Sequence, residues 1–330
     1  MAPDPDFAQK RVAITGATGF VGANLARYLV SLGHEVHLLV RPGHRDWRTR
    51  GLGDQVRMVE TDLGSQEQLD AVIGGVRPHW IFHLAAYGAY SYQNDFSTMV
   101  ETNITGTSNL VHACLKHGFE SFVNAGSSSE YGYKDHAPRE NEEVTPNSYY
   151  AVTKASAALF CGHMARKHDA IIRTLRLYSV YGPWEEPARL IPNLLTKGLD
   201  GGWPPLVDGS IARDYVYVDD VCEAFVAAAQ SRTASPDGIY NIGTGTQTTL
   251  SEIAAAVREI LDIDRKPEFG TMTARSWDTS VWVSDPANAL RDLGWKAKHS
   301  LHDGIAKTVD WFNSNPEILL YYRQEQAASK

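Results

Sequence analysis

The sequence has few of the features that mark several large classes of protein. It contains three cysteines, Cys114, Cys161 and Cys222, whose spacing includes no C-x-x-C pair, so neither a disulfide framework nor a zinc site is indicated. The net charge is -8 and the isoelectric point is near 5.8, which argues against a nucleic-acid-binding surface. No hydrophobic run approaches the length of a membrane span, and the first residues contain no apolar signal segment. We therefore predict a cytoplasmic protein that binds no nucleic acid, membrane or metal.

The most informative feature that is present is a short apolar strand followed by three spaced glycines. The strand around Val12 runs into Gly16, Gly19 and Gly22, at G-x-x-G-x-x-G spacing. The first glycine permits a tight turn, the second lets backbone approach a pyrophosphate, and the third lets the next helix pack on the sheet. The N-terminus of that helix then faces the phosphates. The residues predicted to bind a dinucleotide here are Gly16, Thr18, Gly19, Phe20, Val21 and Gly22.

Apolar strands alternate with helices from residue 12 to residue 177. The predicted strands are 35–40, 56–59, 80–84, 121–125 and 171–177, and the helices between them are 66–73, 96–116 and 149–168. This alternation predicts an α/β fold with a doubly wound parallel sheet and ligands at the carboxyl ends of its strands. After residue 177 the pattern changes, and short elements are separated by Gly182-Pro183, Gly201-Gly202-Trp203-Pro204-Pro205 and Asp208-Gly209. We assign 1–177 to a Rossmann domain and 178–330 mainly to a smaller substrate-binding lobe, with 214–242 returning to the Rossmann domain.

Two groups of residues carry candidate chemistry. Tyr150 and Lys154 lie four residues apart in a predicted helix, and an adjacent ammonium lowers the pKa of a phenol from about 10, which makes it a proton relay. Tyr149 is the competing candidate, but the residue four positions after it, Thr153, carries no charge. Serines also follow the predicted strand 121–125, where a doubly wound sheet places its ligands. Serines are ordinary turn formers as well, so this cluster gains weight only beside the other motifs.

Taken in order, these motifs resemble the extended short-chain dehydrogenases/reductases, the NAD(P)-dependent epimerase/dehydratase family that acts on nucleotide sugars. The resemblance covers about residues 11–311, and the motifs that carry it are Gly16-x-x-Gly19-x-x-Gly22, the serine run before Tyr131-Gly132, Tyr150-x-x-x-Lys154, Tyr181-Gly182-Pro183 and Arg213-Asp214-Tyr215-Val216-Tyr217-Val218-Asp219-Asp220. It implies a catalytic set of Ser127, Tyr150, Lys154 and Asn103, with Ser128 replacing Ser127 if the register shifts. It also implies a nucleotide-sugar substrate and a homodimer.

The same resemblance implies further contacts. Asp62 matches the family's acidic residue beside the adenine, and Arg213 and Arg275 match its pyrophosphate-contacting arginines. The other residues predicted to line the cofactor are Leu63, Leu84, Ala85 and Ala86. The other residues predicted to contact the substrate are Ser128, Ser129, Tyr87 and Ser179, the last in a place where many relatives have asparagine.

The end of the second predicted strand favours NADP(H) over NAD(H). NAD sites usually place an acidic residue there for the ribose 2′-hydroxyl, whereas the 2′-phosphate of NADP needs cations. Here Arg41 and Arg45 follow the strand, and no carboxylate occurs before Asp46. The alternative that both arginines are solvated loop charges stays open.

The predicted reaction is reduction of a 4-keto-6-deoxy nucleotide sugar. Dehydratases of the family have an acidic residue two places after the catalytic hydroxyl, but this chain has Ser129 there and Glu130 one place later. An NADP(H) preference favours a reductase that consumes its cofactor. A 4-epimerase with a tightly bound cofactor is the main alternative, followed by a 4,6-dehydratase that uses Glu130 and by a non-catalytic NADP(H)-binding protein.

Overall fold

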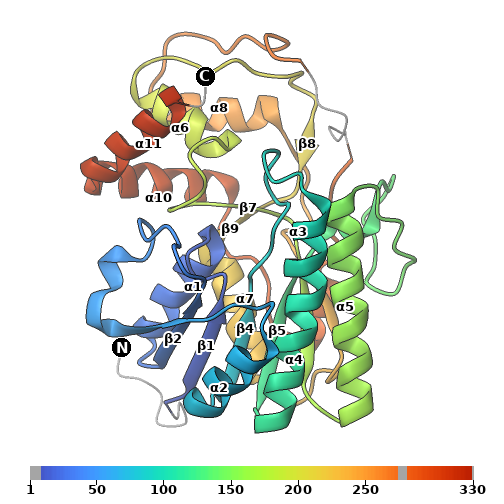
Figure 1. The fold of residues 1–330 in the computed structure, drawn as a ribbon. Helices are drawn as coiled ribbons and strands as arrows, with labels where there is room; N and C mark the ends of the chain where they lie inside the picture. The colour runs from blue at the N-terminus through green and yellow to red at the C-terminus, as the bar shows by residue number, and fades with distance from the viewer. Residues whose placement is uncertain (1–8, 274–280, 329–330) are drawn as a thin grey trace.

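A seven-stranded parallel sheet lies at the centre of the computed structural model, which describes residues 9–273 and 281–328 (Figure 1). The strand order is β10-β6-β5-β4-β1-β2-β3, which confirms the predicted doubly wound α/β fold. Its strands are β1 (Arg11–Thr15), β2 (Glu35–Val40), β3 (Val56–Glu60), β4 (Trp80–His83), β5 (Ser121–Ser127), β6 (Ile172–Leu177) and β10 (Ile239–Ile242).

Helices cover both faces of the sheet, because its strands carry apolar residues on both sides. Along β1, Val12 and Ile14 join one buried cluster and Ala13 joins the other. The first cluster lies under α1 (Phe20–Ser31) and α7 (Val218–Gln230), which pack together. The helices over the second cluster are α2 (Gln66–Val76), α4 (Gly106–His117) and α5 (Tyr149–His168).

A smaller helical lobe lies above the sheet in Figure 1 and has its own apolar cluster. Its helices are α6 (Leu190–Leu199), α8 (Leu250–Ile260), α10 (Leu301–Ser314) and α11 (Pro316–Ala328). Two short pairs of strands accompany it, β7 (Ser179–Tyr181) with β9 (Tyr215–Tyr217), and β8 (Ala212–Arg213) with β11 (Thr248–Thr249). The chain returns to the large sheet between β9 and β11, since β10 pairs with β6.

Two elements differ from the sequence prediction in ways that affect the site. The helix predicted over 96–116 is divided into α3 (Phe96–Val100) and α4 by a π-helical turn at Glu101–Thr105. Such turns are frequent at functional sites, and this one contains Asn103. Strand β5 extends two residues beyond the predicted 121–125, because Gly126 and Ser127 continue the pairing with β6. Ser127 is therefore the last residue of a central strand.

The three cysteines are free and buried. Within the described ranges no helix is long and apolar enough to cross a membrane. Over the same residues, no three His, Cys, Asp or Glu side chains are grouped so that they could hold a metal ion.

Candidate active site

The glycine turn after β1 leaves no room for side chains. Gly16 has a φ of +68°, and a Cβ added there would lie 2.5 Å from both the nitrogen of Ala85 and the carbonyl carbon of Leu84. A Cβ on Gly22 would lie 2.3 Å from the Gly16 oxygen. Helix α1 then begins at Phe20 with no side-chain cap and no acidic residue in its first turn. The turn and the positive end of the helix fit the pyrophosphate of a dinucleotide.

The loop after β4 is held against this turn by hydrogen bonds. The Ala85 nitrogen donates to Thr15 Oγ1 at 3.3 Å, and the Leu84 nitrogen donates to the Thr15 oxygen at 3.1 Å. Further along, Tyr87 donates its backbone nitrogen to Asn103 Oδ1 and accepts a bond from Asn103 Nδ2, both at 2.8 Å. Asn103 Nδ2 also donates to Thr153 Oγ1 at 2.9 Å. The Asn103 amide, predicted as catalytic, thus fixes the loop and α5 through contacts within the protein.

The two predicted arginines after β2 differ in their surroundings. Arg41 is exposed. Arg45 lies 3.6 Å from Glu325 of α11, so part of its charge is engaged by the lobe. The first carboxylate after the strand, Asp46, is paired with Arg50 at 3.0 Å. No carboxylate between residues 41 and 45 competes with a 2′-phosphate at this strand end.

The residues predicted beside the adenine occupy the turn between β3 and α2. Asp62 is exposed, and its Oδ1 accepts a bond from the Gly64 nitrogen at 2.9 Å. The Leu63 carbonyl accepts a bond from Asn109 Nδ2 of α4 at 3.0 Å. The turn is therefore hydrogen-bonded to α4, and the Asp62 carboxylate lies at the surface.

The structure brings Ser127 and Tyr150 together at the carboxyl end of β5. Burial raises the pKa of Tyr150 to about 12, although a hydrogen bond with the Ser127 hydroxyl opposes the increase. Lys154 is 3% exposed, and its own pKa is lowered because burial disfavours the ammonium. The expectation that Lys154 lowers the pKa of Tyr150 is wrong for this structure, since desolvation outweighs any such effect. The phenol is held in its protonated form at neutral pH.

Tyr149 lies on a different face of the same helix, since consecutive residues are about 100° apart. Its side chain is 63% exposed, and its ring lies 4.7 Å from that of Phe96. The Thr153 side chain is buried against Asn103. Of the two neighbouring tyrosines, Tyr150 is therefore the one placed beside the serines.

The serine run and Glu130 have different roles. Ser127 Oγ and Ser129 Oγ are 2.7 Å apart and share a hydrogen bond. Glu130 is fully buried, accepts from the Ser127 nitrogen at 2.8 Å, and pairs with Arg176 Nε at 2.8 Å. The Arg176 guanidinium also lies over the ring of Tyr131, 4.4 Å from its centroid. The Glu130 carboxylate is therefore engaged within the protein, where its two contacts hold the end of β5 in place.

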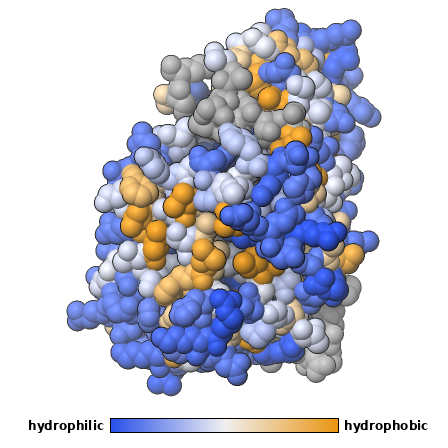
Figure 2. All heavy atoms as spheres, turned by 90° about the vertical axis from the view of Figure 1, so that its right-hand side faces the viewer, coloured by the Kyte–Doolittle hydropathy of each residue, from blue (hydrophilic) through white to orange (hydrophobic). Residues whose placement is uncertain are grey.

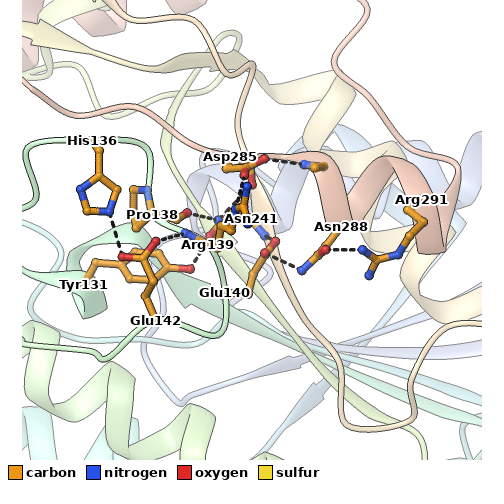
Figure 3. Close-up of polar contacts among 11 residues, drawn as sticks. Tyr131, His136, Pro138, Arg139, Glu140, Glu142, Asn241, Asp285, Asn288 and Arg291 are labelled. Carbon is orange, nitrogen blue, oxygen red and sulfur yellow. Dashed lines mark hydrogen bonds and ion pairs between the residues drawn. The ribbon is translucent and has the colours of Figure 1, made fainter.

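The segment after β5 is anchored to β10 and α9 (Ala287–Leu293) by a polar network (Figure 3). Asn241 accepts from the Tyr131 hydroxyl at 2.8 Å and donates to the carbonyl oxygens of Pro138 and Asp285. Glu140 accepts from the Asn241 nitrogen at 2.8 Å and from Asn288 Nδ2 at 2.7 Å. Burial raises the pKa of Glu140. These contacts join parts of the chain that no local sequence pattern connects.

The substrate side of the site is assembled around Asp214, the residue after Arg213. Asp214 is fully buried and accepts hydrogen bonds from the backbone nitrogens of Thr244 at 2.8 Å and of Gly245 and Ser284 at 3.0 Å. Its own carbonyl accepts from the nitrogen of Ser179 at 2.9 Å, which places that predicted residue beside Asp214. Asp214 belongs to the motif that begins at Arg213, but the sequence alone predicted no function for its side chain.

A narrow pocket lies between the end of β5 and the segment 281–283. Its walls include Ser128, Tyr131, Tyr178 and Trp282. Trp282 was not predicted from the sequence, because a lone tryptophan in a loop carries no recognisable signal. Arg275, predicted to contact the pyrophosphate, lies outside the described residues.

Comparison with known proteins agrees with this geometry. A UDP-glucose 4-epimerase of Mycolicibacterium smegmatis is 30% identical over 93% of this chain and 100% of its own length. The crystal structure of a UDP-glucose 4-epimerase from Thermotoga maritima with UDP-glucose has a TM-score of 0.85 and 26% identity, covering 93% of this chain and 99% of that one. MoeE5 in complex with UDP-glucose and NAD has a TM-score of 0.80 and 29% identity, covering 93% and 99%.

The trifunctional dehydratase/epimerase/reductase RHM1 of Arabidopsis thaliana is 26% identical, and this chain spans about half (48%) of its length. Residues 12–243 match the model of the NAD dependent epimerase/dehydratase family, whose members use a nicotinamide cofactor. The chain belongs to the NAD dependent epimerase/dehydratase family.

Proposed function

We propose that the protein is an NADP(H)-dependent reductase of the C4 keto group of a 4-keto-6-deoxy nucleotide sugar. The observation that carries this choice is the end of β2, where Arg41 is exposed and the first carboxylate, Asp46, is already paired with Arg50. A guanidinium and a 2′-phosphate form strong charge-assisted hydrogen bonds. A reductase consumes its cofactor, and a preference for NADPH is consistent with net reduction of the keto sugar.

The side chains at the end of β5 support this direction of reaction. Bound NADPH supplies the hydride for C4 of the sugar. Tyr150 gives its phenolic proton to the C4 oxygen, and Ser127 donates a hydrogen bond to the same oxygen. A pKa of about 12 keeps Tyr150 protonated at neutral pH, which is the form that a proton donor needs. We assign Lys154, buried one helical turn away, to the nicotinamide ribose.

The buried pair of Glu130 and Arg176 argues against dehydratase chemistry. Eliminating water from the sugar needs an acid/base group besides the tyrosine. Ser129 stands where dehydratases have that acid, and the carboxylate of Glu130 is 0% exposed and engaged by Arg176 and the Ser127 nitrogen. Releasing Glu130 toward a substrate would leave the Arg176 charge buried without its partner.

A 4-epimerase is the second candidate, favoured by the similarity to epimerases and by the NAD bound in the MoeE5 structure. An epimerase oxidises and then reduces the same carbon, so it consumes no cofactor. The two functions use the same Ser127 and Tyr150 and differ in the cofactor that is bound and in the substrate that is offered.

The experiment is incubation of the purified protein with NADPH or NADH and a panel of UDP-, GDP-, CDP- and dTDP-sugars, including their 4-keto-6-deoxy forms. Reduced nicotinamide is followed by absorbance, and products by mass spectrometry. We expect one NADPH to be oxidised per product molecule, which is heavier than its substrate by two hydrogen atoms. A product of unchanged mass without loss of NADPH would replace the reductase by the epimerase. Loss of water would identify a dehydratase, and cofactor binding without turnover a non-catalytic protein.

We also propose that the protein is a homodimer that uses the outer face of α3 and α5. Figure 2 shows apolar side chains gathered on this side of the molecule. Phe96, Tyr149, Val152 and Leu159 are between 42% and 65% exposed, and three of them follow one face of α5. Leu159→Asp is expected to give monomers in sedimentation experiments, whereas Leu320→Asp, a substitution of an exposed leucine on α11, leaves the dimer intact.

A further inference from the structure

Trp282 joins the two halves of the predicted substrate site. Its indole Nε1 donates to Ser128 Oγ at 3.1 Å, and Ser128 is the residue directly after Ser127 at the end of β5. On its ring face lies the guanidinium of Arg213, with the central carbon 5.3 Å from the ring centroid. One side chain therefore contacts both the strand end where the sugar is expected to react and the arginine predicted to bind the diphosphate.

The backbone around Trp282 is attached to the same strands that carry Arg213. The backbone nitrogen of Trp282 donates to Gln247 Oε1 at 3.0 Å. The residue after Gln247 is Thr248 of β11, which pairs with Arg213 of β8. Two residues after Trp282, the Ser284 nitrogen donates to the buried carboxylate of Asp214 at 3.0 Å. The indole is therefore held at three points, through its backbone, its ring nitrogen and its face.

A guanidinium stacked on an indole is preorganised for an anion. The aromatic face attracts the cation and restricts the number of conformers that binding must order. Arg213 Nη1 also donates to the Ala212 carbonyl at 2.8 Å, which restricts the guanidinium further. The indole nitrogen is a donor only, so its bond also fixes Ser128 Oγ as an acceptor toward the ring. Arg213 and the end of β5 are thereby kept at a defined separation.

We propose that Trp282 is a positioning residue that sets the distance between the diphosphate and the reacting carbon of a nucleotide sugar. Through its face it holds Arg213 for the diphosphate, and through its ring nitrogen it holds Ser128, the residue after Ser127. The inference rests on the nucleotide-sugar substrate proposed above but not on whether the reaction is reduction or epimerisation.

The test uses the whole protein and the nucleoside diphosphates UDP, dTDP, GDP and CDP as probes, titrated by calorimetry without any reaction. For the diphosphate that binds most tightly, Trp282→Leu is expected to weaken affinity about 3- to 10-fold. Trp282→Phe keeps an aromatic face and is expected to retain most of the affinity. Trp203→Leu is the matched control, since this lobe tryptophan donates its ring nitrogen to the carbonyl of Arg265, a residue not predicted to bind the substrate.

Two further measurements separate positioning from general packing. Because Trp282 acts on the diphosphate through Arg213, the double variant Arg213→Ala/Trp282→Leu should bind the diphosphate no more weakly than Arg213→Ala alone. With a substrate identified from the sugar panel, Trp282→Phe should lower kcat about 3- to 10-fold with little change in KM, because it removes the bond to Ser128. NADPH affinity, measured in parallel, should not change in any of these variants.

The outcomes that overturn the inference are distinct from failure of the proposed function. Unchanged diphosphate affinity in Trp282→Leu, additive losses in the double variant, or an equal loss in Trp203→Leu would each remove the positioning role while leaving the substrate class intact. A wild-type protein that binds none of the four diphosphates would instead refute the nucleotide-sugar substrate, and the inference with it.

Discussion

The cofactor half and the substrate half of the site are built in different ways. The glycine turn is a local structure, in which a Cβ on Gly22 would meet the oxygen of Gly16 at 2.3 Å. The substrate half depends on side chains that join distant segments, since Asp214 binds Thr244 and Ser284, 30 and 70 residues away. A local structure of backbone atoms leaves a readable sequence pattern. Long-range side-chain contacts do not, so the two halves should respond differently to substitution.

The largest effect on activity is expected from substitution of Tyr150, which lies where the cofactor half and the substrate half meet. Tyr150→Phe removes the proton that the C4 oxygen receives, so kcat should fall about 10²- to 10⁴-fold while NADPH affinity stays within about twofold of the wild type. Steady-state kinetics and a cofactor titration test this. Tyr149→Phe is the matched control, because that ring is 63% exposed and packs on Phe96. An active Tyr150→Phe enzyme would mean that another group supplies the proton.

On the cofactor side, Arg41→Ala should remove the preference for NADPH. A charge-assisted hydrogen bond contributes about 1.5–3 kcal/mol, so NADPH affinity should fall about 10- to 100-fold while NADH affinity changes little. Arg57→Ala on β3 is the control, since this exposed arginine is paired with Glu35 at 3.3 Å and 71% exposed. Equal binding of both cofactors by the wild type would contradict the assignment of NADP(H).

On the substrate side, Asp214→Asn should break the long-range contacts and leave the glycine turn intact. The amide would replace one of the two accepting oxygens by an NH2 group facing the donors of either Thr244 or of Gly245 and Ser284, at a cost of about 1–3 kcal/mol in the free energy of unfolding. Diphosphate affinity should fall and NADPH affinity persist. Denaturant unfolding and calorimetry measure these effects, with the exposed Asp208→Asn as control. Parallel loss of both ligands would show that the halves are not independent.

The smallest effect concerns pH. Glu185, between β7 and α6, is 5% exposed, its Oε2 finds no hydrogen-bond partner among the described residues, and burial raises its pKa from 4.5 to about 8. The folded protein therefore binds more protons than the unfolded chain between these values, so the free energy of unfolding falls as pH rises through that window. Glu185→Gln should flatten this dependence and stabilise the protein at pH 8 by about 1 kcal/mol.

Thermal unfolding at several pH values measures the change, and Glu186→Gln provides the contrast. Glu186 pairs with the buried Arg48 at 2.9 Å, so its substitution should destabilise the protein instead. If the Glu185→Gln protein loses stability with rising pH as steeply as the wild type, the buried carboxyl is not the source of the dependence.

The same contrast explains what could be predicted from the sequence. The strand alternation and the glycine turn follow from local patterns, and the structure confirms the fold they predict. The pKa of Tyr150 was predicted in the wrong direction, because Lys154 is visible in the sequence and burial is not. The pairing of Glu130 with Arg176 joins residues 46 positions apart, and the bond from Trp282 to Ser128 joins residues 154 positions apart, beyond the reach of any local pattern.

The most direct test of the central claim is the fate of the C4 hydrogen of the cofactor. With NADPH carrying deuterium at the transferable position of the nicotinamide, and the 4-keto-6-deoxy sugar that the panel identifies, mass spectrometry and NMR would locate the label. The account predicts one deuterium at C4 of the product sugar and one NADP⁺ formed for each product molecule. A product without deuterium, formed while NADPH remains unconsumed, would contradict it.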